Sequence, residues 1–350
     1  VGQVVERVST PWTREDARTL AALSAAGLVF VAALLLATTP PDALTALDPK
    51  AVTRYNVIAG AIGIVAALLV TATSAVMTRK HPQASGIALA HTVPFLTAAS
   101  ALRLSQSHWD TAGWGWTGLG LLIGSLAVLA LPKRSRISIA APLVVGTVLA
   151  ATGLLVRLGQ LSQAGISAIL FALVIVLLQV APWIALAHIP VRILDADTTE
   201  QIPAKGITDQ ISTSFMFVVA LRAGGAIAAL FLAVALMTAP ETRSVSLPLT
   251  LIVLGAVSLV LQTRSIRARV EVLLGALTGL IVILVAAVLG AYADPRTMPW
   301  LTLSAIATAL VLVITNVVGP RARPHLTRIA DTISVLSLFV LLPLAVYLWS

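Results

Sequence analysis

The sequence predicts an all-α polytopic membrane protein with eleven transmembrane helices. Of its 350 residues, 58% are apolar and 11% are charged, whereas ordinary soluble domains carry roughly 25% charged residues. Apolar runs of about 20 residues, enough to cross ~30 Å of hydrocarbon, recur along the whole chain. This composition excludes a soluble enzyme. The net charge of +9 is scattered between apolar runs rather than gathered in a basic stripe, so we expect no nucleic-acid partner.

Short breakers that combine proline or glycine with charge mark the limits of the spans. Thr39–Asp42 follows the first span, Arg79–Pro82 the second, and Pro132–Arg134 the fourth. Asp294–Arg296 and Gly319–Arg321 flank the tenth. In chain order, the expected spans are Arg18–Thr38, Tyr55–Met77, Gln83–Leu104, Thr111–Leu131, Ile137–Leu158, Leu161–His188, Phe215–Thr238, Val245–Gln262, Val270–Ala293, Pro299–Val318 and Ile329–Trp349. Residues 1–17 are then a cytosolic pre-membrane segment, and residues 18–349 are one membrane domain.

The distribution of lysine and arginine predicts the orientation of this domain. With the amino end in the cytoplasm, 16 of the 23 cations fall in inner segments and six in outer segments, Arg103 among them, while Arg222 lies within a span. Cytoplasmic segments of membrane proteins carry such an excess. Most tryptophans and tyrosines fall at the outer ends, where aromatic belts form. We therefore expect a multi-pass protein of the plasma membrane with a cytoplasmic amino end and an external carboxyl end.

The longest connection, residues 189–214, is the most acidic part of the chain and a candidate docking site for a partner. Ile207, Ile211, Phe215 and Val218 recur at helical spacing near its end. This pattern fits an amphipathic helix at the inner interface, and it fits equally well a seventh helix that begins in solvent. The candidate partner contacts of the loop are Arg192, Asp195, Asp197, Glu200 and Asp209.

The spans contain few groups capable of chemistry. All 14 acids lie in loops or within a few residues of a span end, which disfavours an ion-coupled carrier with carboxylates near the midplane. Arg222 is expected to reach the interface, to form a structural pair, or to contact a lipid headgroup or a partner. His91 is expected to bond a carbonyl of a neighbouring helix, because no second ligand sits three or four residues away. We expect no catalytic residue, metal or cofactor other than bound lipid.

Glycines within the spans indicate where helices pack closely. Gly120 and Gly124 form a GxxxG motif in the fourth span, and Gly275 and Gly279 repeat this spacing in the ninth. Such ridges allow close approach of helix backbones. The four glycines are therefore candidate contacts, either between helices of this chain or with a second copy.

Three stretches resemble the EccD family, the membrane subunits of mycobacterial-type type VII secretion systems. They are Ser9–Trp12 before the first span, Val180–Val191 around the end of the sixth, and Arg328–Leu344 in the last. The family also has eleven spans and a cytoplasmic amino end, so the resemblance covers nearly the whole chain. Its members normally begin with a cytosolic ubiquitin-like domain, which is absent from these residues.

The resemblance implies a structural role without enzymatic activity. A member would pair with a second copy around a lipid-filled cavity and join EccB, the ATPase subunit EccC and EccE in a complex that exports small helical proteins. A secondary transporter or lipid flippase is the alternative that the number of spans favours. A third reading is a polytopic transferase that uses the DxD spacing of Asp195 and Asp197, although the chain has no other motif for hydrolysis or ATP use.

Overall fold

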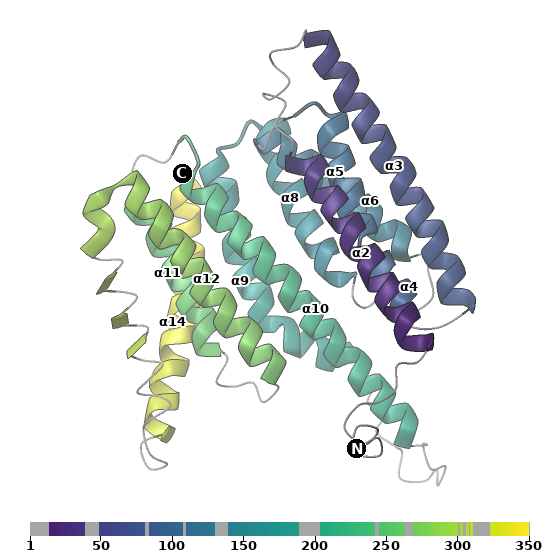
Figure 1. The fold of residues 1–350 in the computed structure, drawn as a ribbon. Helices are drawn as coiled ribbons and strands as arrows, with labels where there is room; N and C mark the ends of the chain where they lie inside the picture. Colours follow the sequence, from purple (N-terminus) through teal and green to yellow (C-terminus); the bar gives the residue numbers. More distant parts are fainter. Residues whose placement is uncertain are drawn as a thin grey trace, which may run out of the picture. The chain divides into compact units, whose positions relative to one another are not determined.

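The computed structural model describes residues 14–38, 49–80, 84–107, 110–129, 139–188, 204–241, 245–262, 269–299 and 323–349, with short pieces between 302 and 310. Throughout these ranges the regular structure is helical, which confirms the all-α prediction (Figure 1). The expected span Pro299–Val318 lies largely outside the described residues. Two compact units divide the chain, an amino-terminal unit of Val1–Gly146 and a carboxy-terminal unit of Thr147–Ser350.

Within the described ranges, nine helices are long and apolar enough to cross a membrane. They correspond to the expected first to seventh, ninth and eleventh spans. The eighth expected span is α11, Ser246–Gln262, an apolar helix of 17 residues. At about 1.5 Å per residue, this helix is shorter than ~30 Å of hydrocarbon. The chain is a multi-pass membrane protein, and nine of the eleven expected spans have helices of sufficient length.

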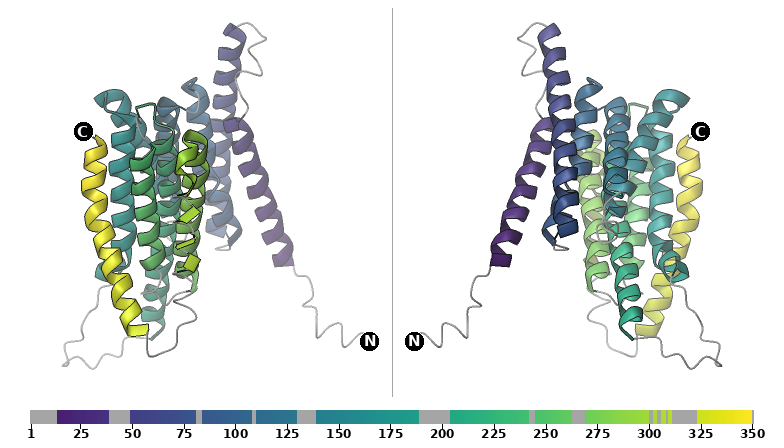
Figure 2. Two further views of the ribbon diagram at one scale, coloured as in Figure 1. Left: turned by 90° about the vertical axis from the view of Figure 1, so that its left-hand side faces the viewer. Right: turned by 90° about the vertical axis from the view of Figure 1, so that its right-hand side faces the viewer.

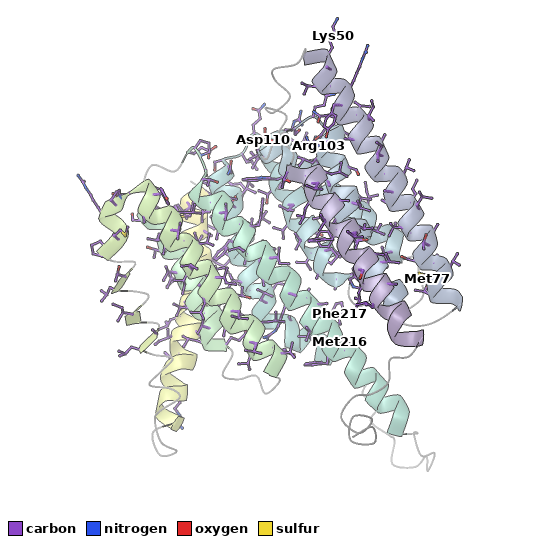
Figure 3. All side chains as sticks on the ribbon, viewed as in Figure 1. Lys50, Met77, Arg103, Asp110, Met216 and Phe217 are labelled. Atoms are coloured by element: carbon purple, nitrogen blue, oxygen red, sulfur yellow. The ribbon has the colours of Figure 1, made fainter. Side chains whose placement is uncertain are left out.

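The amino-terminal unit is built around α5, Val93–Leu104, which packs against α2, Arg14–Thr38, α3, Pro49–Lys80, and α6, Thr111–Leu129. Val93, Leu96 and Ala99 of α5 form the core together with Ala33, Ala67, Ala90, Val128 and Ile139. In Figure 3, Lys50 and Met77 mark opposite ends of α3, and Arg103 lies toward the Lys50 end. Small core residues allow α2, α3 and α5 to approach closely.

The expected third span is interrupted in the structure. It consists of α4, Ala84–Ala90, and α5, which are separated by a turn at His91 and Thr92. Pro94 causes the break because it lacks an N–H group and its ring cannot follow a regular helical turn. The Thr92 hydroxyl and backbone N–H both donate to the carbonyl oxygen of Leu89, at 2.8 and 3.1 Å, which satisfies an acceptor at the end of α4.

In the described part of the carboxy-terminal unit, five helices form a closed arrangement. Its helices are α9 (Gln163–His188), α10 (Ala204–Met237), α11, α12 (Arg269–Ala293) and α14 (Arg323–Trp349). Helix α9 packs on α10, and α10 packs on α12. Helix α12 packs on α11, α11 packs on α14, and α14 packs on α9, which closes the ring. Figure 2 shows α14 at the edge of this unit. The side chain of Phe171 in α9 is fully buried. Its ring lies against Gly255 of α11, where an added Cβ would come within 2.6 Å of it. Helix α8, Ala140–Gly159, connects the two units.

The seventh helix begins well before the span that the sequence predicts. Helix α10 is continuous over 34 residues from Ala204, and its apolar span starts only at Ser214. The last part of the segment 189–214 is therefore helical and continues directly into the membrane span, as the alternative of a helix beginning in solvent expects. Residues 189–203, including Arg192, Asp195, Asp197 and Glu200, lie outside the described residues.

Candidate functional site

The carboxy-terminal unit holds an ion pair between two of its membrane helices. Arg222 lies in α10 and Glu271 in the first turn of α12. The guanidinium Nη1 is 3.6 Å from the carboxylate Oε2, and the exposed fractions of the side chains are 5% and 10%. Among the possible roles that the sequence leaves open for Arg222, the structure shows a structural pair, and contact with a lipid headgroup or a partner stays a prediction. Burying both charges together offsets part of the cost that each would have alone in a bilayer.

A chain of amide and hydroxyl groups connects α9 with α11 in the same unit. The Gln179 side-chain amide donates to the hydroxyl oxygen of Ser258. The Gln262 amide donates in turn to the backbone carbonyl of Gln179, at 3.0 Å. Gln163, at the start of α9, donates to the carbonyl of Ala235 in α10, at 2.9 Å. Hydrogen bonds between helices typically contribute about 0.6 kcal/mol each in a membrane protein. These hydrogen bonds join α9 to α10 and α11 across helix faces that are otherwise apolar.

A small cavity of about 20 Å³ adjoins the ion pair. Residues of α9, α10, α11 and α12 form its wall. They are Leu178, Arg222, Leu259, Gln262, Leu274, Gly275 and Thr278.

The amino-terminal unit has a second buried arginine, Arg103, which connects three helices. Its Nε donates to the carbonyl of Leu36 in α2, at 2.5 Å, and its Nη1 donates to the Asn56 side-chain oxygen in α3, at 3.2 Å. Arg103 and Asn56 are each 6% exposed. Because α2 ends at Thr38, the Leu36 carbonyl is one of its last four, which have no partner within the helix. A cation there also favours the negative end of the helix dipole.

Three of the four candidate glycines lie against other helices of the same unit. A Cβ on Gly120 would be 2.7 Å from the Ala98 Cα, and a Cβ on Gly124 would be 2.6 Å from the Pro94 Cα, both in α5. A Cβ on Gly279 would be 2.9 Å from the carbonyl oxygen of Ala256 in α11. The GxxxG ridge of α6 therefore contacts α5, and Gly279 contacts α11. Gly275 lies in the wall of the small cavity.

The amino-terminal unit also contains an apolar groove of about 520 Å³ between α3, α5 and α6. Its polar residues are Thr71, Thr97 and Ser105. Their hydroxyls donate to backbone carbonyls, among them those of Ala67, Gly120 and Leu102. The rest of the wall is aliphatic or aromatic, for example Ile64, Leu68, Leu104, Trp116, Leu119 and Ile123. The groove therefore suits an aliphatic ligand.

The described part of the chain shows no cluster of reactive side chains. Its residues contain no group of three or more His, Asp or Glu that could hold a metal ion. The His91 Nδ1 is 2.6 Å from the carbonyl oxygen of Ile87, one turn earlier in the same span, whereas the sequence predicts a bond to a neighbouring helix. Asp209 lies near the start of α10, and its side chain is outside the described part of the structure.

Sequence reasoning missed Arg103 and Gln179 as site residues. Arg103 enters the charge count as an outer-loop cation, yet its side chain is buried. The available signal was a polar residue within an apolar run, as for Gln179, or at its end, as for Arg103, because such a residue needs a partner on another helix. The sequence does not indicate the partners themselves. Leu36 lies 67 residues from Arg103, and Ser258 lies 79 residues from Gln179.

Comparison with known proteins places this fold in a family. No curated protein matches the chain in sequence. Protomer 1 of the ESX-3 core complex matches it in structure with a TM-score of 0.69 and 17% identity, over 99% of this chain and 78% of the other. The MycP5-free ESX-5 inner membrane complex in State II matches with a TM-score of 0.61 and 16% identity, over 89% of this chain and 72% of the other. The EccD-like transmembrane domain matches residues 17–350. The chain therefore belongs to the EccD family, the integral membrane subunits of type VII secretion systems.

Proposed function

We propose that this chain is a non-enzymatic scaffold of a type VII secretion complex in the plasma membrane. The observation that carries the proposal is the match to the EccD-like transmembrane domain over residues 17–350. The role of the buried polar groups supports it. Arg103, Arg222, Gln179 and Gln262 all face groups on other helices of the same unit. Side chains used in this way hold helices in register and are not poised to bind and convert a substrate.

The scaffold pairs with a second copy around a lipid-filled cavity. The apolar groove between α3, α5 and α6 supports the lipid part of this proposal, because its three hydroxyl groups already donate to backbone carbonyls and the rest of its wall is aliphatic or aromatic. An aqueous lining would require polar or charged side chains, and water in so apolar a space tends to dewet. Acyl chains match the aliphatic wall without leaving polar groups unpaired.

The segment 189–214 provides the docking site for cytosolic parts of the partners EccB, EccC and EccE. Helix α10 starts ten residues before its apolar span, so about 15 Å of helix precedes the span. A helix that is continuous with a packed membrane span transmits the position of a docked partner rigidly. Arg192, Asp195, Asp197 and Glu200 precede this helix in the sequence, and they provide charge for recognition.

Affinity purification of the full-length tagged chain from native membranes tests this proposal. We expect the ATPase, the other Ecc subunits and an untagged second copy to copurify, and deletion of the chain to abolish both assembly and export. The alternative, a secondary transporter or lipid flippase, expects a chain that purifies without these subunits and moves a solute or lipid in proteoliposomes. That combination of results would replace the scaffold role.

A further inference from the structure

Arg222 has fewer hydrogen-bonding partners than a buried guanidinium requires. Its side chain is 5% exposed, and its one ion pair, from Nη1 to Glu271, is 3.6 Å long. Nε and Nη2 are buried and have no hydrogen-bond partner among the residues that the structure describes. Buried donors without an acceptor carry a full desolvation penalty, which is largest for charged groups. An additional acceptor near Arg222 would remove this penalty.

The small cavity beside the ion pair is the place for such an acceptor. Its volume is about 20 Å³, and Arg222 forms part of its wall. One water molecule needs roughly 10–15 Å³ measured in this way, so the cavity has room for one water. Gly275 also lines the cavity, and the absence of a side chain at this position contributes to the space.

The charges and polar groups around the cavity favour a neutral ligand. The carboxylate of Glu271 balances the guanidinium, so a small anion would meet an opposing negative charge nearby. Thr278 and Gln262 are the other polar residues of the wall. The Thr278 hydroxyl donates to the carbonyl of Leu274, at 2.5 Å, which leaves its oxygen able to accept a hydrogen bond. A ligand that can both accept from Arg222 and donate to Thr278 fits this set.

We propose that this cavity is a hydration site, in which one ordered water accepts a hydrogen bond from the Arg222 guanidinium and donates to the Thr278 hydroxyl oxygen. The water completes a polar connection between α10 and α12 beside the ion pair. Nε and Nη2 have almost no surface accessible to water in this structure, so the guanidinium must turn for one of them to donate to the water. Such waters typically make about three hydrogen bonds and form part of the structure. This inference concerns the fold of the unit and does not depend on the proposed secretion role.

A density map of the purified membrane complex, at a resolution that shows ordered water, tests the proposal directly. We expect one water-sized peak within hydrogen-bonding distance of both Arg222 and Thr278. A well-ordered Arg222 with no such peak would overturn the hydration site. Replacement of the peak by an anomalous bromide signal after soaking crystals in bromide would overturn it in favour of an anion.

A pair of matched variants provides a second readout. Thr278→Val removes a partner of the water together with the hydrogen bond to Leu274. Thr152→Val removes the same kind of bond, from a fully buried threonine to the carbonyl of Val148, at 2.8 Å. We expect Thr278→Val to lower the Tm of the complex by about 2 °C more than Thr152→Val. Equal shifts would contradict the proposal. If Thr278→Val prevents assembly, the density map of the unmodified complex still shows whether the water is present.

Discussion

The Nε of Arg103 donates a 2.5 Å hydrogen bond to the carbonyl oxygen of Leu36, a residue 67 positions earlier in the chain. The bond joins the end of α5 to the last turn of α2. With its second bond, to Asn56, Arg103 holds the upper ends of three helices of the amino-terminal unit (Figure 3).

Arg103→Leu should therefore destabilise the amino-terminal unit by about 2 kcal/mol, because it leaves the Leu36 carbonyl and the Asn56 amide without their charged partner. Arg157→Leu is the matched control, since Arg157 is an exposed arginine in the last turn of α8. Thermal unfolding of the purified complex, followed by tryptophan fluorescence, measures both. Equal losses would show that the burial of Arg103 contributes nothing specific.

The Arg222 and Glu271 pair should be strongly non-additive. Glu271→Leu leaves a buried guanidinium without its counter-charge and should cost about 3–5 kcal/mol, whereas the double variant Arg222→Met with Glu271→Leu should recover most of the loss. A double-mutant cycle on thermal stability measures the coupling. Additive losses would mean that the two charges do not interact in the folded protein.

Gly120 should tolerate no Cβ. In Gly120→Ala the new methyl would meet the Thr97 carbonyl oxygen at 2.5 Å and the Ala98 Cα at 2.7 Å. Because both are backbone atoms, α5 and α6 must separate, at a cost of about 1–3 kcal/mol. Gly27→Ala in α2 is the control, because nothing lies within 4 Å of a Cβ there. The control should be neutral or stabilising by up to ~1 kcal/mol through helix propensity. Reversal of this order, measured by thermal unfolding, would contradict the close packing of α5 and α6.

The orientation of the chain can be tested with single cysteines, because the sequence contains none. A cysteine at Ser135 should react with an impermeant thiol reagent only from the cytoplasm, and one at Ser350 only from outside. The expectation rests on the excess of lysine and arginine in the inner segments. Labelling of both positions from the same side would contradict the count of eleven spans.

Asp195→Asn with Asp197→Asn should leave export largely intact, because we assign these residues no catalytic role. Secretion of a native substrate measures the effect, and copurification of the Ecc subunits shows whether the complex still forms. Loss of export from a fully assembled complex would favour the transferase reading, whereas loss of assembly would identify the two residues as partner contacts.

The hydropathy of the sequence was enough to predict most of the helices that the structure describes. The structure has α6 at Thr111–Leu129 and α12 at Arg269–Ala293, within two residues of the expected spans. This succeeds because hydrogen bonds within a helix are local, and because the thickness of a bilayer requires a minimum apolar length. The early start of α10 at Ala204 was harder to predict, since a helix outside the bilayer needs no apolar run.

Only the tertiary structure decided which helix faces meet. The sequence allowed several contacts for the Arg222 side chain. Nothing in the spacing indicated Glu271, 49 residues later, as its partner. Gly120 and Gly279 had the same local motif, but the first contacts α5 and the second α11. Apolar helices in lipid have no strong hydrophobic preference for one neighbour over another, so small residues and a few polar groups determine the pairing through contacts between distant parts of the chain.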